Sequence, residues 1–142
     1  INGIVTASNI FLEETQSKLI RSFDNPTQLP RMVKFYELNE QIQRRVKKGI
    51  KLRMVSSIPK PQTWMEKYME RNKKELRETI FVSPRLFPFE STVIIDDARV
   101  IIIDMREKSF AILIENKDLA LTLSSIHNLI WEQYRLTDGR AS

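Results

Sequence analysis

The chain has 142 residues, of which 42% are hydrophobic and 29% are charged, with a formal net charge of +5. This size and composition predict a single domain spanning 1–136, followed by a flexible tail at 137–142. The absence of cysteine excludes disulfides and cysteine-ligated zinc, and the single histidine, His127, leaves too few ligands for a transition metal, so we expect no cofactor. No apolar run approaches the roughly 18 residues of a membrane span, which predicts a cytoplasmic protein without membrane contact.

The chain begins with Ile1 rather than Met, so we expect a fragment of a longer polypeptide. Its positive charge is spread out, and the densest run, at 44–48, falls at the end of an expected helix, where cations meet the helix dipole favourably. The alternative is a nucleic-acid-binding patch, but no aromatic residues interleave with this run for base stacking.

The amino-terminal half alternates predicted strands and helices. Two prolines and several turn formers mark a loop, and Gly49 ends a helix that returns to an apolar strand, as in α/β folds. In chain order we expect a strand at 1–6, a helix at 10–23, a loop at 24–30, a helix at 32–48, a strand at 50–55 and a helix at 64–77 that begins with a capping box of Thr63 and Glu66.

The carboxyl-terminal half predicts strands at 79–82, 92–95, 100–103 and 110–114, followed by a helix at 117–134 that Asn116 caps. Together the elements indicate an α/β fold with a mixed β-sheet flanked by helices. The apolar stripe of the last helix comprises Leu119, Leu123, Ile126, Ile130 and Tyr134. The residues expected to be buried are Val93, Ile94, Ile95, Ile101, Ile103, Ile112, Leu123, Ile126 and Ile130.

The stretch 89–96 has the frame of the phospholipase D motif His-x-Lys-x-x-x-x-Asp without its chemistry. Phe89 stands at the histidine position, Ser91 at the lysine position, and only Asp96 is retained. Without the histidine there is no nucleophile to form a phosphohistidine, and without the lysine no cation to hold the phosphoryl oxygens. We therefore expect no enzymatic activity.

The order of elements, with "KKGIKLRMV" in the middle, "LFPFESTVIIDDARVIII" after it and "AILIENKDLALTLSSIHNLIWEQY" at the end, resembles one half of the phospholipase D fold. It is most similar to the degenerate version found in archaeal transcriptional regulators of the TrmB type. In that family a winged helix-turn-helix reads DNA, while the phospholipase D-like part serves as an effector or dimerisation domain. The opening strand and helix depart from the family pattern, and no DNA-reading motif is visible, so DNA contact is expected only through a domain outside this chain.

The candidate ligand-binding residues are Ser56, Ser57, Arg85, Glu90 and Asp96. The two serines follow an apolar strand directly, and ligands of open α/β sheets bind beyond the carboxyl ends of strands. Arg85 and Glu90 flank the inactive motif, so a small polar or anionic ligand is the expected occupant. An ordinary capped loop explains the serines equally well.

Two further features have simpler interpretations than catalysis. Asp96 and Asp97 could be paired carboxylates, but hairpin turns favour Asp for local hydrogen bonding. His127 has no acidic neighbour three or four residues away, which favours a surface or half-buried structural histidine over a general base. Lys51 and Arg53 lie on a strand expected to be central, which suggests that this strand is near an edge or has one face open.

The sequence thus favours a noncatalytic sensor or effector domain of a prokaryotic transcription-regulatory or signalling protein. The competing classes are a phospholipase D-like phosphodiesterase or nuclease relative and a basic nucleic-acid-binding module. One phospholipase D-like half leaves apolar surface that the two-half enzymes cover, so we expect a homodimer. Its interface would set the Asp96–Asp97 hairpin against the strand that carries Lys51 and Arg53.

Overall fold

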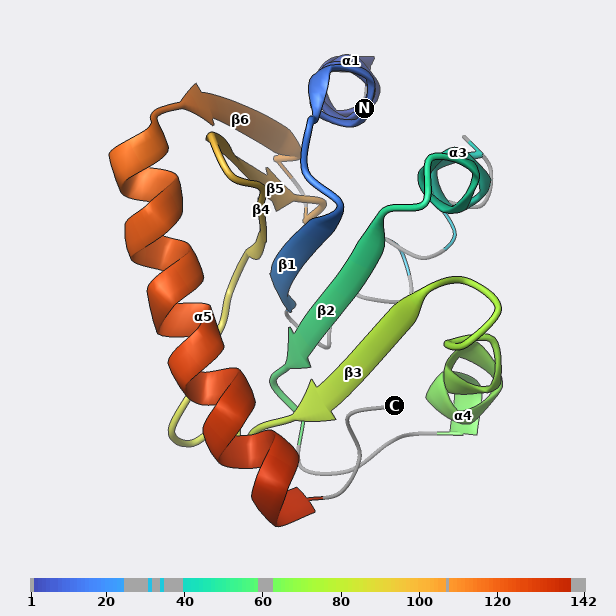
Figure 1. The fold of residues 1–142 in the computed structure, drawn as a ribbon, viewed down its shortest axis with the longest axis vertical. Coiled ribbons are helices and arrows are strands. Elements are labelled where there is room, and N and C mark those ends of the chain that lie inside the picture. Colours follow the sequence, from blue (N-terminus) through green and yellow to red (C-terminus); the bar gives the residue numbers. More distant parts are fainter. Residues whose placement is uncertain are drawn as a thin grey trace.

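The computed structural model describes residues 2–24, 31, 34, 40–58, 63–106 and 108–138. Six strands form one mixed sheet in the order β3-β2-β1-β4-β5-β6, with helices on both faces, which confirms the predicted α/β class (Figure 1). The strands are β1 (Leu19–Asp24), β2 (Lys51–Ser56), β3 (Arg77–Phe81), β4 (Thr92–Ile95), β5 (Arg99–Asp104) and β6 (Phe110–Glu115). The helices are α1 (Asn2–Glu14), α3 (Gln41–Lys47), α4 (Thr63–Glu70) and α5 (Lys117–Asp138).

The sheet has a parallel half and an antiparallel half that meet between β1 and β4. Strands β1, β2 and β3 run parallel, while β4, β5 and β6 form an antiparallel meander. Because β4 runs antiparallel to β1, the amino end of β4 lies beside the carboxyl ends of the three parallel strands. The turn after β4, which contains Asp96, therefore lies at the other end of the strands, beside the amino end of β1.

The two faces are covered differently. On one face, α1 packs Ile4, Phe11 and Leu12 on a cluster that includes Ile20 and Ile101, while α4 packs Tyr68 on Met54. Among the described helices, α5 is the one that covers the other face, where it crosses the sheet diagonally (Figure 1). It buries Ala120 and Trp131 against alternate residues of the parallel strands, namely Phe23, Val55 and Ile80. The core is thus split by the sheet into two layers.

The amino-terminal prediction was wrong, since 2–14 is helical and 19–24 is a strand rather than the end of a helix. The spacing of Ile4, Ser8, Phe11, Leu12 and Thr15 puts five buried residues on one helical face, which outweighs the β-branched start of the segment. The segment 19–24 has two sheet neighbours, β2 and β4, and its hydrogen bonding is therefore satisfied as a central strand.

Other boundaries differ less. Gly49 adopts a φ of 70° after α3, as expected for a helix C-cap, and Asn116 Oδ1 accepts a hydrogen bond from Leu119 N at 2.9 Å. The helix predicted at 64–77 ends at Glu70, because Arg77 already pairs with Leu52 in the sheet. The last helix continues to Asp138, beyond the start of the predicted tail.

Burial along α5 differs from the predicted stripe. The fully buried residues are Ala120, His127 and Trp131, whereas Ile126 is 48% exposed, as is Ile112 in β6. Burial of Ile126 and Ile112 was therefore wrongly predicted, while Ile95, Ile101 and Ile103 are buried as expected. The face of α5 that contacts the sheet carries Ala120, His127 and Trp131, and one of these residues is polar. The predicted apolar stripe therefore lies along the flank of the helix, beside this face.

Some predictions fall outside the described residues. These are the loop after Asp24, the first part of the helix at 32–48, the Thr63 side chain of the capping box, and the tail beyond Asp138. Within the described part of the chain, no helix is long and apolar enough to cross a membrane.

Candidate functional site

Polar side chains gather on the α1 face of the sheet where the parallel strands end. Asp24 pairs in register with Ser56 on β2, and Thr92 begins β4 on the other side of β1. Side chains alternate along a strand, so these three share the face of Ser22, Met54 and Ile94. Asp24, Ser56 and Thr92 are buried, yet Ser56 Oγ and Thr92 Oγ1 have no hydrogen-bond partner among the described residues. Buried polar atoms without partners are uncommon in native folds.

A partly enclosed cavity of about 80 Å³ lies on the same face, between the sheet and the helices that cover it. Its lining combines apolar side chains of β1, β2, β4 and β5 with polar side chains of the sheet and of the helices. The described lining residues are Ser8, Phe11 and Leu12 of α1, Gln41, Ile42 and Arg45 of α3, Tyr68 of α4, and Ile20, Ser22, Asp24, Leu52, Met54, Arg77, Ile94 and Ile101 of the sheet.

Asp24 is the buried carboxyl group of this cavity. Among the described residues, its side chain accepts one hydrogen bond, from Ser22 Oγ to Oδ2 at 2.7 Å. Burial raises the pKa of Asp24 to about 7, although the Ser22 hydroxyl and the charge of Arg77 both act to lower it. The Asp24 carboxyl, with few hydrogen-bond donors to stabilise its charge, therefore ionises near neutral pH.

The two arginines of the cavity wall are held by main-chain oxygens. Arg45 donates to the carbonyls of Ile50 at 2.7 Å and Glu75 at 2.6 Å. Arg77 lies 3.5 Å from the centre of the Tyr68 ring, donates to the Tyr68 carbonyl and bonds the Glu75 carboxylate at 2.7 Å. Both guanidinium groups are thus engaged in the fold.

Ser8 supplies a second polar group without a partner. Its side chain lines the cavity from α1, the residue is 8% exposed, and its Oγ makes no hydrogen bond. Burial of a hydroxyl without a partner costs roughly 1–3 kcal/mol. The Asp24 carboxyl and the Ser8 hydroxyl therefore leave hydrogen-bonding capacity unused in one cavity.

Of the predicted ligand-binding residues, the two serines lie beside this site. Ser57 N donates to the Asp24 carbonyl at 3.2 Å, which fixes the chain just beyond β2. The Ser57 hydroxyl donates to the Phe87 carbonyl, so it already has a partner. Ser56 is fully buried, and its hydroxyl is free.

The other three predicted residues do not converge with the serines. Arg85 is exposed in the loop between β3 and β4, and Glu90 is an exposed partner of Arg106 at 3.2 Å. Asp96 lies beyond the carboxyl end of β4, at the other end of the strands from Ser56 and Ser57, so it does not share a site with them.

Asp96 has a structural role in its turn. Its carboxylate accepts bonds from the main-chain nitrogens of Ala98 at 2.9 Å and Arg99 at 2.6 Å, from the Thr15 hydroxyl at 2.8 Å and from the Arg99 guanidinium at 3.1 Å. The same guanidinium donates to the carbonyl of Phe11. Asp96 therefore joins the hairpin to the end of α1, which supports the turn interpretation of this residue.

The inactive motif is occupied by packing residues. The Phe89 ring contacts the Phe23 ring with centroids 5.2 Å apart and the Phe87 ring at 6.0 Å. Phe89 thus packs against the core under α5.

His127 lies on the opposite face from the cavity. It is fully buried rather than half-buried, its Nε2 donates to the Ser22 carbonyl at 3.0 Å, and its ring lies between Phe23 and Trp131. Burial lowers the pKa of His127 to about 4, so the imidazole is neutral at pH 7. It is a structural residue of the core.

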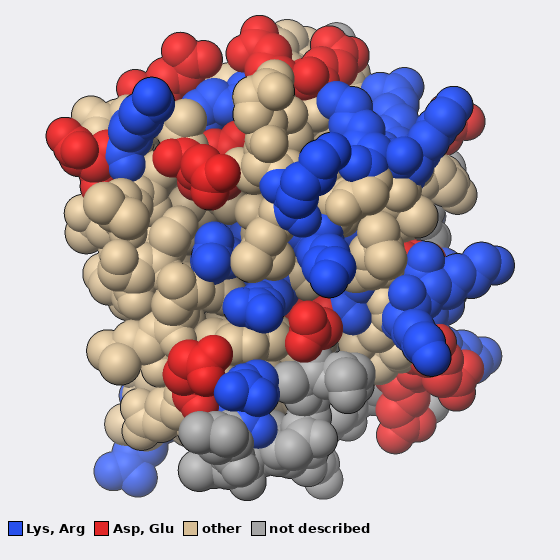
Figure 2. Space-filling view, in the orientation of Figure 1, with Lys and Arg blue, Asp and Glu red and all other residues tan. Residues whose placement is uncertain are grey.

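The charged surface is uneven. Figure 2 shows Lys and Arg over the side where α3 lies and over the middle of the view, while the flank formed by α5 carries long uncharged stretches. The basic run at 44–48 is split: Arg44 is exposed, whereas Lys48 Nζ donates to the Leu12 carbonyl at 2.7 Å. This run stabilises helix ends, as its position in the sequence indicates.

No protein-family model matches the chain, and no curated protein or solved structure is significantly similar to it. Within the described ranges, no group of three His, Asp or Glu side chains could hold a metal ion.

The sequence missed Asp24 and Ser8 because both fell in segments assigned to the wrong element. The signal was present as Leu-Ile-Arg-Ser-Phe-Asp, an alternating run that ends in a carboxylate, which is typical of a strand followed by a site.

Proposed function

We propose that this chain is a noncatalytic sensor or effector domain that binds a small polar molecule in the cavity beside Asp24. The observation that carries the proposal is a buried carboxyl that accepts one hydrogen bond from the described residues and lines a cavity of about 80 Å³. Polar groups in ligand sites fix the orientation of the ligand, and Asp24 and Ser8 have hydrogen-bonding capacity that the described residues leave unused.

The cavity selects for a compact ligand. Its volume accommodates a few water molecules or a small organic group. A hydrogen-bond donor on the ligand, either an amine or a hydroxyl, would satisfy Asp24, and an acceptor would satisfy the Ser8 hydroxyl. A cationic amine would also favour the ionised carboxylate, so its binding should strengthen as the pH rises through 7.

The absence of catalysis is part of the proposal. Phe89 and Ser91 supply neither a nucleophile nor a cation, and the carboxylate of Asp96 is used in the fold. Resemblance to the degenerate phospholipase D-like half of TrmB-type regulators gives the biological setting: transcription regulation or signalling in a prokaryote, with DNA contacted only by another domain.

A homodimer is the second element of the proposal, with the second copy at β6. This strand is at the edge of the sheet, its sequence Phe-Ala-Ile-Leu-Ile-Glu has no Pro or Lys to block pairing, and Phe110 and Ile112 are 42% and 48% exposed. Antiparallel pairing of two β6 strands about a two-fold axis would give hydrogen-bond partners to the outward-facing main-chain groups of both strands. The Asp96–Asp97 hairpin and the strand that carries Lys51 and Arg53 are not part of this interface, because the Asp96 carboxylate is buried and bonded within the fold.

Thermal unfolding in the presence of small amines, polyols and amino-acid-like compounds tests the cavity. A ligand should raise the melting temperature of the wild type and of the Asp118→Asn control, whose carboxylate is exposed on α5. The shift should be lost in Asp24→Asn and in Ser8→Leu, which fills the cavity. Ligand stabilisation that survives both changes would place the site elsewhere.

A further inference from the structure

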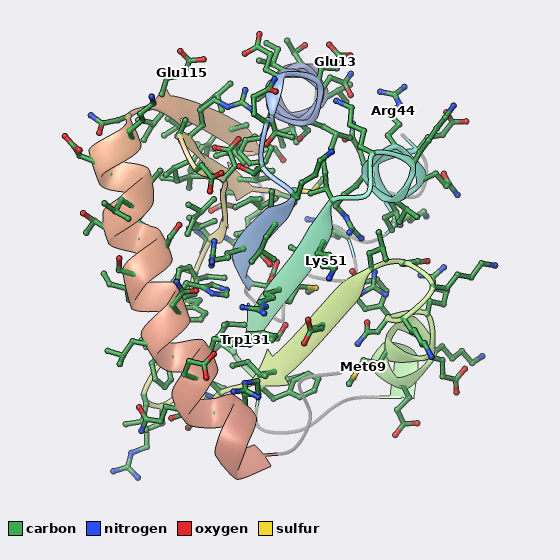
Figure 3. All side chains as sticks on the ribbon, viewed as in Figure 1. Glu13, Arg44, Lys51, Met69, Glu115 and Trp131 are labelled. Atoms are coloured by element: carbon green, nitrogen blue, oxygen red, sulfur yellow. The ribbon has the colours of Figure 1, made fainter. Side chains whose placement is uncertain are left out.

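The amino-terminal halves of β1, β2 and β3 are left open on the face that α5 covers. On this face Phe23, Val55 and Ile80 lie in the core under α5. The residues two positions earlier on each strand are Arg21, Arg53 and Glu78, which are partly exposed, and Lys51 precedes Arg53 by two more. Figure 3 shows Lys51 on the uncovered part of the sheet, beyond the edge of α5 where Trp131 lies.

Two of these cations are direct neighbours. Arg21 pairs in register with Arg53 on adjacent parallel strands, and both side chains are on the same face. Lys51 stands two residues away from Arg53 on that face. Like charges directly opposite one another in a sheet are destabilising. Burial and the charge of Arg53 both lower the pKa of Arg21, which reflects this crowding.

The protein compensates the cluster only in part. Arg21 Nε donates to Asn128 Oδ1 at 2.7 Å, a neutral partner. The Glu78 carboxylate lies 3.9 Å from Arg53 Nε, beyond hydrogen-bond distance, and this buried nitrogen has no hydrogen-bond partner in the described part of the chain. The Arg53 guanidinium lies 5.5 Å from the centre of the Trp131 ring. Two guanidinium groups thus have unused donors on one surface.

We propose that Arg21, Arg53 and Lys51 form a binding site for a phosphate-type oxyanion, free or carried by a small phosphorylated molecule. Paired guanidinium groups present forked donors that match the oxygens of phosphate, and a nearby ammonium adds a point charge. The bound oxyanion relieves the repulsion between Arg21 and Arg53. The site lies across the sheet from the Asp24 cavity and does not depend on it.

A small anion fits this surface better than a nucleic acid strand. Single-stranded binding combines a basic track with aromatic faces on which bases stack. Trp131, the aromatic neighbour of Arg53, is 1% exposed, so its ring is not available for stacking. Glu78 lies on the other side of Arg53 in register and interrupts the positive surface along β3.

Unfolding by denaturant with increasing inorganic phosphate, with chloride adjusted to hold ionic strength constant, tests the site. At phosphate concentrations about 100 times the dissociation constant, the folding equilibrium constant should rise about 100-fold. The Asp24→Asn variant should respond like the wild type. Equal responses to phosphate and chloride would reduce the effect to general screening and overturn the proposal.

Three substitutions locate the effect. Arg21→Gln should lose the phosphate response and, without phosphate, be at least as stable as the wild type, because the repulsion is removed. Lys51→Gln, an exposed change that leaves packing intact, should weaken phosphate binding several-fold. Arg85→Gln removes an exposed cation from the loop before β4 and should change nothing. A full response in Lys51→Gln and Arg21→Gln would exclude the site.

A second titration distinguishes a small phosphate-type anion from the phosphates of a nucleic acid strand. A single-stranded oligonucleotide is compared with inorganic phosphate at equal total phosphate, over a range of salt concentrations. Phosphate and a sugar phosphate should bind, and the oligonucleotide should bind no better per phosphate. Oligonucleotide binding with a steep salt dependence and no effect of inorganic phosphate would overturn the small-anion proposal in favour of a nucleic-acid surface.

Discussion

The two faces of the sheet handle charge in opposite ways. On the α1 face, a carboxyl is enclosed in the core and its pKa rises to about 7. On the α5 face, the cations of Arg21, Lys51 and Arg53 stay at the surface, while the enclosed group is a histidine whose pKa falls to about 4. Both buried groups meet at Ser22, whose hydroxyl bonds Asp24 and whose carbonyl accepts from His127. The fold therefore favours the neutral forms of Asp24 and His127, one on each side of β1.

Truncation in the two core layers should give the largest losses of stability. Ile95→Ala on the α5 face and Ile101→Ala on the α1 face each remove a fully buried side chain and should cost roughly 2–5 kcal/mol. Ile126→Ala, at a position 48% exposed, should cost far less. Chemical denaturation measures all three, and a cost for Ile126→Ala equal to that of Ile95→Ala would contradict the burial described here.

The pH dependence of stability should separate the two buried titratable groups. A raised pKa means that Asp24 stabilises the fold below pH 3.8 and that this contribution is lost as the pH rises through about 7. A lowered pKa means that His127 contributes stability above pH 6.5, which is lost as the pH falls through about 4. Between pH 4 and 6.5 the two slopes oppose each other, so they partly cancel in the wild type.

Replacing one of the two residues should reveal the pH dependence of stability that the other contributes. In Asp24→Asn, stability should rise with pH between 4 and 6.5 by roughly 3 kcal/mol more than in the wild type. In His127→Gln, which keeps a donor for the Ser22 carbonyl, stability should fall as the pH rises from 4 to 7. Denaturation at a series of pH values measures both, and identical slopes in the two variants would show that neither group titrates as described.

Self-association should depend on the edge strand of the antiparallel half rather than on the parallel half. Ile112→Lys places a charge on the exposed face of β6 and should give a monomer at concentrations of tens of micromolar, with the fold retained. Leu86→Lys is the matched control, because Leu86 is 65% exposed in the loop before β4, and this variant should remain a dimer. Sedimentation of the wild type as a strict monomer would exclude the homodimer.

The sequence predicted the antiparallel half better than the parallel half. Strands β4, β5 and β6 and the Asn116 cap follow from local patterns, namely short apolar runs and a side chain three residues before its donor. Strand β1 places polar residues, Ser22 and Asp24, in the core, and this burial depends on neighbours far away in the chain. Because Asp24 was assigned to a loop, the cavity was missed, and local pattern could not have paired Arg21 with Arg53.

The smallest effects should distinguish two adjacent serines at the end of β2. The Ser57 hydroxyl donates to the Phe87 carbonyl, so Ser57→Ala should cost about 1 kcal/mol. The Ser56 hydroxyl is buried without a partner, and Ser56→Ala removes a polar atom that contributes no hydrogen bond, so stability should be unchanged or slightly higher. Thermal unfolding resolves the difference. A larger loss for Ser56→Ala than for Ser57→Ala would mean that the Ser56 hydroxyl has a partner in solution, and an ordered water or a ligand bound beside Asp24 would then be the first candidates.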